Sequence, residues 1–150
     1  MDLSKIKSRY SGVQTRLKNI SDYGCLFLAL CTIIEEVTGK EADIIGIIQL
    51  SRQKGWLSAD YTVEDSIAIL NEYTGKSFKR EIFGTLPAVI KDNEFTIEKW
   101  YNERINEKGE TVKYTHFKRR FVDTLLSSVT VKDGRIKEYY IYSYCTEQKK

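Results

Sequence analysis

The stretch that most constrains the fold is residues 21–31, in which a short polar turn leads directly into a strongly apolar segment. Apolar residues recur at helical spacing and predict a helix over residues 24–38, with Asp22 as its N-cap and Gly39 as its terminator. The segment is apolar on nearly all sides before Glu35. We therefore expect this helix to be buried at the centre of the fold, with the rest of the chain packed around it.

Cys25 lies at the junction between the turn and the predicted helix. A thiol in the first turn of a helix faces unpaired backbone N–H groups and the positive end of the helix dipole, which favour the nucleophilic thiolate. The structural alternative is a small apolar side chain that helps the helix to pack, because free cysteine is often buried. Cys31 follows about 240° further around the helix, so we expect it in the core and not in the same site.

Composition and charge exclude several classes of protein. The chain has 150 residues, of which 41% are hydrophobic and 30% charged, and this predicts a single globular domain over residues 1–150. The net charge of +3 favours neither nucleic acid nor a membrane surface as a partner. Three cysteines without a CxxC pair argue against a disulfide framework or a zinc site, and we expect no metal and no cofactor. Without a signal-like or membrane-spanning apolar run, the expected location is the cytoplasm, with no membrane partner.

Further along the chain, helical patterns are followed by alternating ones. Helices are predicted over residues 41–54 and 63–74, the second capped by Thr62 with Asp65 in a capping-box position. Residues 86–90 fit either a short helix or a turn, and residues 1–20 an irregular lead-in. Period-two patterns predict strands over residues 77–83, 95–104, 111–122 and 135–144. Helices followed by an antiparallel sheet define an α+β fold.

The only histidine, His116, lies inside a predicted strand some ninety residues after Cys25. A cysteine at a helix start and a distant histidine on a strand form the arrangement that thiol hydrolases use. The sulfur attacks, the imidazole takes its proton and later protonates the leaving group, and a third polar residue fixes the imidazole tautomer.

Two short motifs carry a resemblance to a known family. Asp22-Tyr23-Gly24-Cys25 before a buried helix resembles the nucleophile region of papain-like cysteine peptidases, most closely the bacteriocin-processing-peptidase-like branch and its uncharacterised bacterial and phage relatives. Thr115-His116-Phe117, with the following Asp-containing turn and Thr130-Val131-Lys132 hairpin, is similar to the histidine strand of that group. The resemblance implies a papain-like fold and a hydrolase that cleaves a peptide, isopeptide or related amide bond in a peptide or protein substrate.

Carried over by position, the resemblance makes Cys25 the nucleophile, His116 the base and Asp123 the orienting acid, with Asp133 as the alternative third member. Asp123 follows His116 by an odd number of residues, so on one regular strand the two side chains would lie on opposite faces. Asp133 avoids that difficulty across a hairpin but matches the motif less well. Asn19 stands where the family carries a glutamine that forms the oxyanion hole, and loss of one such donor costs ~10²–10³ in rate.

Two other functions compete with hydrolysis. The short Asn19 amide and the Lys118-Arg119-Arg120 run, where the family has apolar residues, suit a catalytically inactive papain-like scaffold that binds a protein partner, for example a phage or host-interaction protein. Lys118 is expected on the same face as His116, where a cation disfavours the imidazolium. The basic run with Tyr114 and Phe117 could also bind nucleic acid, but the small net charge and the usual solvated character of such strands disfavour this.

Overall fold

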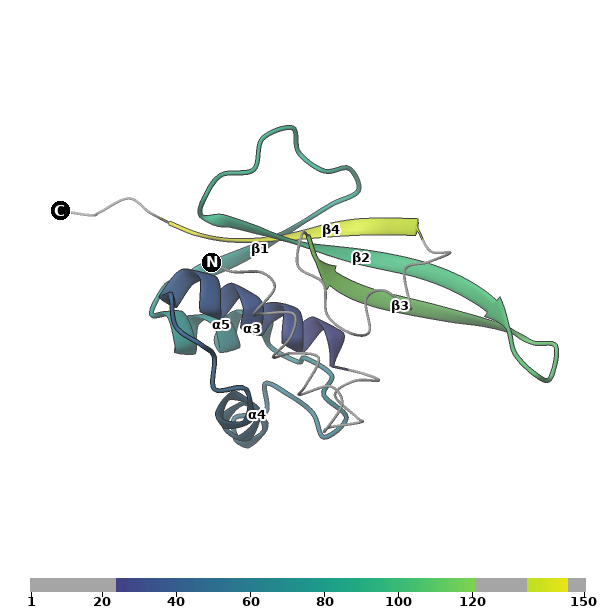
Figure 1. Cartoon of the computed structure of the whole chain (residues 1–150), viewed down its shortest axis with the longest axis horizontal. Helices are drawn as coiled ribbons and strands as arrows, with labels where there is room; N and C mark the ends of the chain where they lie inside the picture. The colour runs from purple at the N-terminus through teal and green to yellow at the C-terminus, as the bar shows by residue number, and fades with distance from the viewer. Residues whose placement is uncertain (1–23, 121–134, 146–150) are drawn as a thin grey trace.

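The computed structural model of the chain describes residues 24–120 and 135–145. In these ranges three helices precede four strands: α3 (Cys25–Thr38), α4 (Ile44–Gln53), α5 (Ser66–Thr74), β1 (Phe78–Phe83), β2 (Glu94–Ile105), β3 (Thr111–Arg119) and β4 (Arg135–Tyr144). The strands form one sheet in the order β1-β4-β2-β3, and each neighbouring pair is antiparallel. The predicted α+β class is confirmed. Figure 1 shows the three helices together beside one face of the sheet.

Helix α3 forms the centre of the core, as the apolar run predicts. Every residue from Phe27 to Glu35 is buried, and Gly39 ends the helix with a left-handed φ of 71°. Gly24 is the N-cap and provides no side-chain hydrogen bond, while the predicted cap Asp22 lies outside the described residues. Around α3 the core is completed by buried apolar residues from α4, α5 and the sheet: Ile47, Ile48, Ile69, Leu70, Phe95, Ile97 and Tyr142.

The predicted start of the third helix is wrong. Helix α5 begins at Ser66, and its N-cap is Asp65, whose carboxylate accepts a 2.9 Å hydrogen bond from the backbone N–H of Ala68. Thr62 therefore does not cap the helix. The physical reason is a local loop, because Val63 forms an isolated antiparallel bridge with Leu57 and is held in an extended conformation. The second predicted helix likewise begins later, at Ile44 in place of residue 41.

The predicted strands agree closely with β1, β2 and β4. Strand β3 ends at Arg119, and the last two residues of its predicted range lie outside the described residues. Residues 86–90 form neither a helix nor a hydrogen-bonded turn, and only Ala88 is a bend. The β2–β3 hairpin closes where predicted, since the Asn106 carboxamide accepts from the backbone N–H groups of Lys108 and Glu110 and Gly109 takes a φ of 77°. The predicted irregular lead-in over residues 1–20 lies outside the described ranges.

Candidate functional site

The fold joins the start of α3 to strand β3. Cys25 is the first residue of α3, and its Sγ accepts a hydrogen bond from the backbone N–H of Phe117, with an N–S distance of 3.5 Å. Phe117 follows His116 directly on β3. The two sequence-predicted residues therefore come from elements that touch, although 92 positions separate the bonded pair. Cys25 as a whole residue is partly exposed.

The position of β3 at the edge of the sheet leaves the Phe117 N–H available. In an antiparallel pair the residues of one strand alternate between bonding their neighbour and pointing their N–H and C=O groups away from it. The backbone N–H of Arg120 donates to the carbonyl of Thr96 on β2, at 3.0 Å, so even-numbered residues of β3 bond inward. The backbone N–H and C=O groups of odd-numbered residues, Phe117 among them, point outward at the edge of the described sheet, where the sulfur of Cys25 lies.

Arg119 fastens α3 to the same strand. Its guanidinium is 2.6 Å from a carboxylate oxygen of Glu36, donates to the hydroxyl of Thr32 at 3.3 Å, and lies 5.3 Å from the ring centre of Phe95. The side chain is only 8% exposed. The expectation of a solvated basic face along residues 118–120 is therefore wrong for its central arginine, because α3 carries the partners that bury it.

His116 leaves β3 on the other face of the sheet. His116 is paired with Trp100 on β2. It is three residues from Arg119 on the same strand, so the two side chains point to opposite faces, and the Arg119 side chain contacts α3. The imidazole is 2% exposed, and no described residue forms a hydrogen bond with its Nε2 atom. Burial, and secondarily the positive charge of Lys118, lowers the pKa of His116 to about 4. The imidazole is therefore neutral at pH 7.

Within the described chain, no hydrogen bond joins the Cys25 sulfur to the His116 imidazole. The sulfur is nevertheless close to the histidine backbone, because two covalent bonds, or about 2.4 Å, separate the Phe117 nitrogen from the Cα of His116. The distance from Sγ to that Cα is thus at most about 6 Å, since the N–S distance is 3.5 Å. The imidazole itself leaves β3 on the face away from α3, so a direct contact between the thiol and the imidazole requires a different His116 rotamer.

The pKa of the Cys25 thiol is raised, because burial disfavours the thiolate more than its hydrogen bonds favour it. The backbone N–H of Phe117 is the largest of the opposing effects, followed by the N–H groups of Leu26 and Cys25 at the helix start. The thiol and the imidazole are therefore both neutral at pH 7. Burial thus leaves the thiol un-ionised and makes the imidazole a weaker base than usual.

The other predicted site residues, Asn19, Asp123 and Asp133, lie outside the described residues, and their roles stay predictions. The N–H of Phe117 is the group that sequence reasoning missed. A backbone donor leaves no mark in the residue types, and only the sheet order shows that β3 is an edge strand. Cys31 is fully buried, as expected for a core residue.

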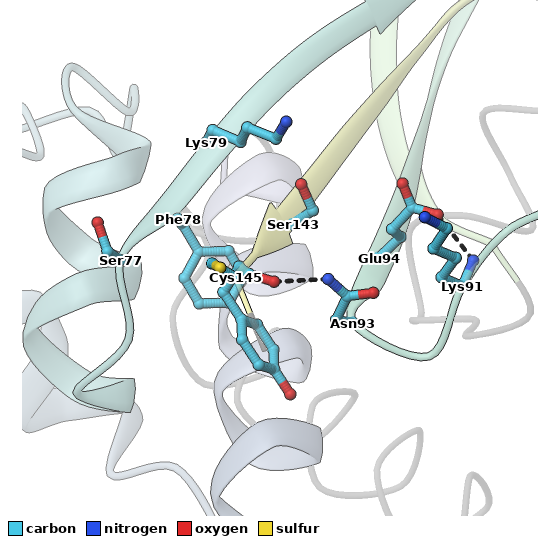
Figure 2. A pocket seen from close by; sticks show the side chains of 9 residues that line it. Ser77, Phe78, Lys79, Lys91, Asn93, Glu94, Ser143 and Cys145 are labelled. Atoms are coloured by element: carbon cyan, nitrogen blue, oxygen red, sulfur yellow. Dashed lines mark hydrogen bonds between the residues drawn. The ribbon is translucent and has the colours of Figure 1, made fainter. Parts of the chain in front are cut away.

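A cavity of about 650 Å³ lies elsewhere, between the ends of β1, β2 and β4 (Figure 2). Ser143 points into it, and the Asn93 amide donates to the carbonyl of Tyr144 along its wall, at 2.5 Å. Its lining residues come from neither α3 nor β3. This cavity is therefore separate from Cys25 and His116, although Cys145 lines it.

Comparison of the chain with protein-family models, with curated proteins and with solved structures found no match in any of the three. Among the helices of the described ranges, none is long and apolar enough to cross a membrane. The described side chains of His, Cys, Asp and Glu form no group of three that could hold a metal ion. The fold and the site thus define an α+β protein in which a cysteine at a helix start contacts a histidine-bearing edge strand.

Proposed function

We propose that this protein is a papain-like thiol hydrolase, with Cys25 as nucleophile and His116 as general base, acting on a peptide, isopeptide or related amide bond. The observation that supports the proposal most directly is the 3.5 Å contact between the Cys25 sulfur and the backbone nitrogen of Phe117. It joins the start of the central helix to the residue that follows the only histidine in the chain.

The chemistry begins from the neutral pair. The His116 imidazole takes the thiol proton as the sulfur attacks the substrate carbonyl, and it then gives that proton to the leaving amine. Water hydrolyses the resulting thioester, with the same imidazole accepting the proton of water and returning it to the sulfur. Asp123, or Asp133 in its place, orients the imidazole, and Asn19 donates to the oxyanion.

A catalytically inactive scaffold of the same fold, which binds a protein partner, is the second candidate. The pKa shifts favour it, because burial raises the pKa of Cys25 and lowers the pKa of His116. Each shift works against the thiolate–imidazolium pair that many thiol hydrolases form at rest. Lys118 adds to the cost of the imidazolium.

Acylation by 4-nitrophenyl acetate separates the two candidates. In a Cys145→Ser background, which removes the exposed thiol, a hydrolase should release one equivalent of nitrophenolate rapidly and carry an acetyl group on Cys25. Cys25→Ser should abolish this burst, and His116→Ala should slow it by about 10²-fold or more, the usual contribution of a general base. Acetylation of Cys25 that is no faster than that of an exposed thiol, or is unaffected by His116→Ala, would leave the inactive scaffold.

A further inference from the structure

We propose that the backbone N–H of Phe117 binds the thiolate of Cys25 and is thereby a catalytic group of the site. The inference rests on the proposed function for its catalytic meaning, but the hydrogen bond and its effect on the thiol can be measured without any substrate. Strand β3 would then supply two groups to the reaction from consecutive residues: the His116 side chain and the Phe117 amide.

The geometry that supports this assignment is that of an edge strand. The inward hydrogen bond from Arg120 to Thr96 fixes the alternation along β3 and turns the Phe117 N–H away from β2. An outward N–H at a sheet edge would normally bond to water. Here it donates to Sγ at 3.5 Å, a distance at which sulfur accepts a hydrogen bond.

Two further contacts and one buried side chain make the arrangement more than a cysteine at a helix start. Arg119 is two residues along the same strand and is tied to Glu36 and Thr32 of α3, so the helix cannot slide along β3 without breaking a buried interaction. His116 is joined to Phe117 by the peptide bond that contains this N–H. Its side chain is 2% exposed, and no described residue forms a hydrogen bond with Nε2. His116 and Phe117 are consecutive on β3, so one strand carries both the proposed base and the amide that contacts the sulfur.

The amide acts chiefly on the charged form of the sulfur. A hydrogen bond to a charged group is worth about twice one between neutral groups, so the N–H stabilises the thiolate more than the thiol. The same preference applies during the reaction whenever the sulfur carries negative charge, as it does during attack and when the tetrahedral intermediate collapses back. The fixed orientation of a strand amide means that no reorganisation is needed at that moment.

Proline at position 117 removes the N–H and provides the test. Proline is tolerated at outward positions of edge strands, so Phe117→Pro can keep β3 paired. Phe117→Ala is the matched control, because both variants lose the ring that packs on Tyr140 and only the proline variant loses the donor. Thr115→Pro places the same residue at the neighbouring outward position, where the side chain is exposed, and controls for proline itself.

The readout is the pH dependence of iodoacetamide alkylation at Cys25, followed by mass spectrometry in the Cys145→Ser background. We expect the thiol pKa to be about one unit higher in Phe117→Pro than in Phe117→Ala, with alkylation at pH 7 about tenfold slower. Thr115→Pro should match the unsubstituted protein. Equal pKa values in Phe117→Pro and Phe117→Ala, or an equal shift in Thr115→Pro, would overturn the assignment.

If Phe117→Pro does not fold, the unsubstituted chain gives the answer by NMR. The Phe117 amide proton should shift with pH at the midpoint of Cys25 ionisation, and Cys25→Ala should abolish that titration; an amide that does not titrate would refute the hydrogen bond. Failure of this inference and failure of the hydrolase proposal are distinguishable. The first is seen in the thiol pKa and the second in acylation and its dependence on His116.

Discussion

The buried imidazole of His116 should make the protein sensitive to acid in a way that can be assigned to one residue. Its pKa is lowered from 6.5 to about 4, chiefly by burial. Between these values the unfolded chain binds a proton that the folded chain does not, so stability falls as pH falls. From the two pKa values, the unfolding free energy should drop by about 2 kcal/mol between pH 7 and pH 5, and by about 3 kcal/mol at pH 4.

The assay is urea unfolding followed by far-ultraviolet circular dichroism at half-unit pH intervals, for the unsubstituted chain and for His116→Asn. Carboxylates titrate in both proteins, so their contribution cancels in the difference, and a constant cost of the substitution changes only the offset. The difference in unfolding free energy should therefore slope with pH below 6.5 and flatten near 4. Lys118→Met should make the difference flatten at a higher pH, with a smaller total drop, because the Lys118 charge helps to lower the pKa of His116. Parallel pH profiles for the unsubstituted chain and His116→Asn would refute the reasoning.

Three other predictions concern the frame that positions the site, each measured by urea unfolding. Asp65→Ala should cost about 1 kcal/mol through loss of the α5 cap, whereas Thr62→Ala should cost less than half of that; the reverse order would contradict the observed helix start. Tyr142→Phe should cost about 1 kcal/mol, because its hydroxyl donates to a buried serine at 3.0 Å, and no loss would show that water replaces the bond. Arg119→Met should cost about 2 kcal/mol, with a coupling to Glu36→Gln of about 1 kcal/mol in a double-mutant cycle; additive effects would mean that the ion pair does not fasten α3.

Local patterns were enough to predict the elements that end on strong local signals. The apolar run and Gly39 define α3 to the residue at its end, and the alternating aromatic residues of 135–144 define β4. Thr62 does not cap the helix because the bridge between Leu57 and Val63 holds Val63 in an extended conformation. The helix and capping propensities of Thr62 and Asp65 do not predict that bridge.

The residues of the candidate site could be chosen from the sequence, but their contacts could not. Cys25 and His116 could be chosen because a thiol at a helix start and a single histidine have few alternatives. The burial of Arg119 depends on Glu36, 83 residues away, and a run of three basic residues reads locally as solvated. The outward N–H of Phe117 depends on strand order and register, which individual residues do not encode.

The measurement that tests the central claim most directly is an NMR titration of the imidazole, because His116 is the only histidine and gives a single set of ring signals. We expect these signals to titrate with a midpoint near 4, and both the signals and the midpoint to move when Cys25 is carboxamidomethylated. The same modification of Cys145 should leave them unchanged. A midpoint near 6.5 would contradict the burial of the imidazole, and ring signals indifferent to the state of Cys25 would contradict the proximity of the sulfur to His116.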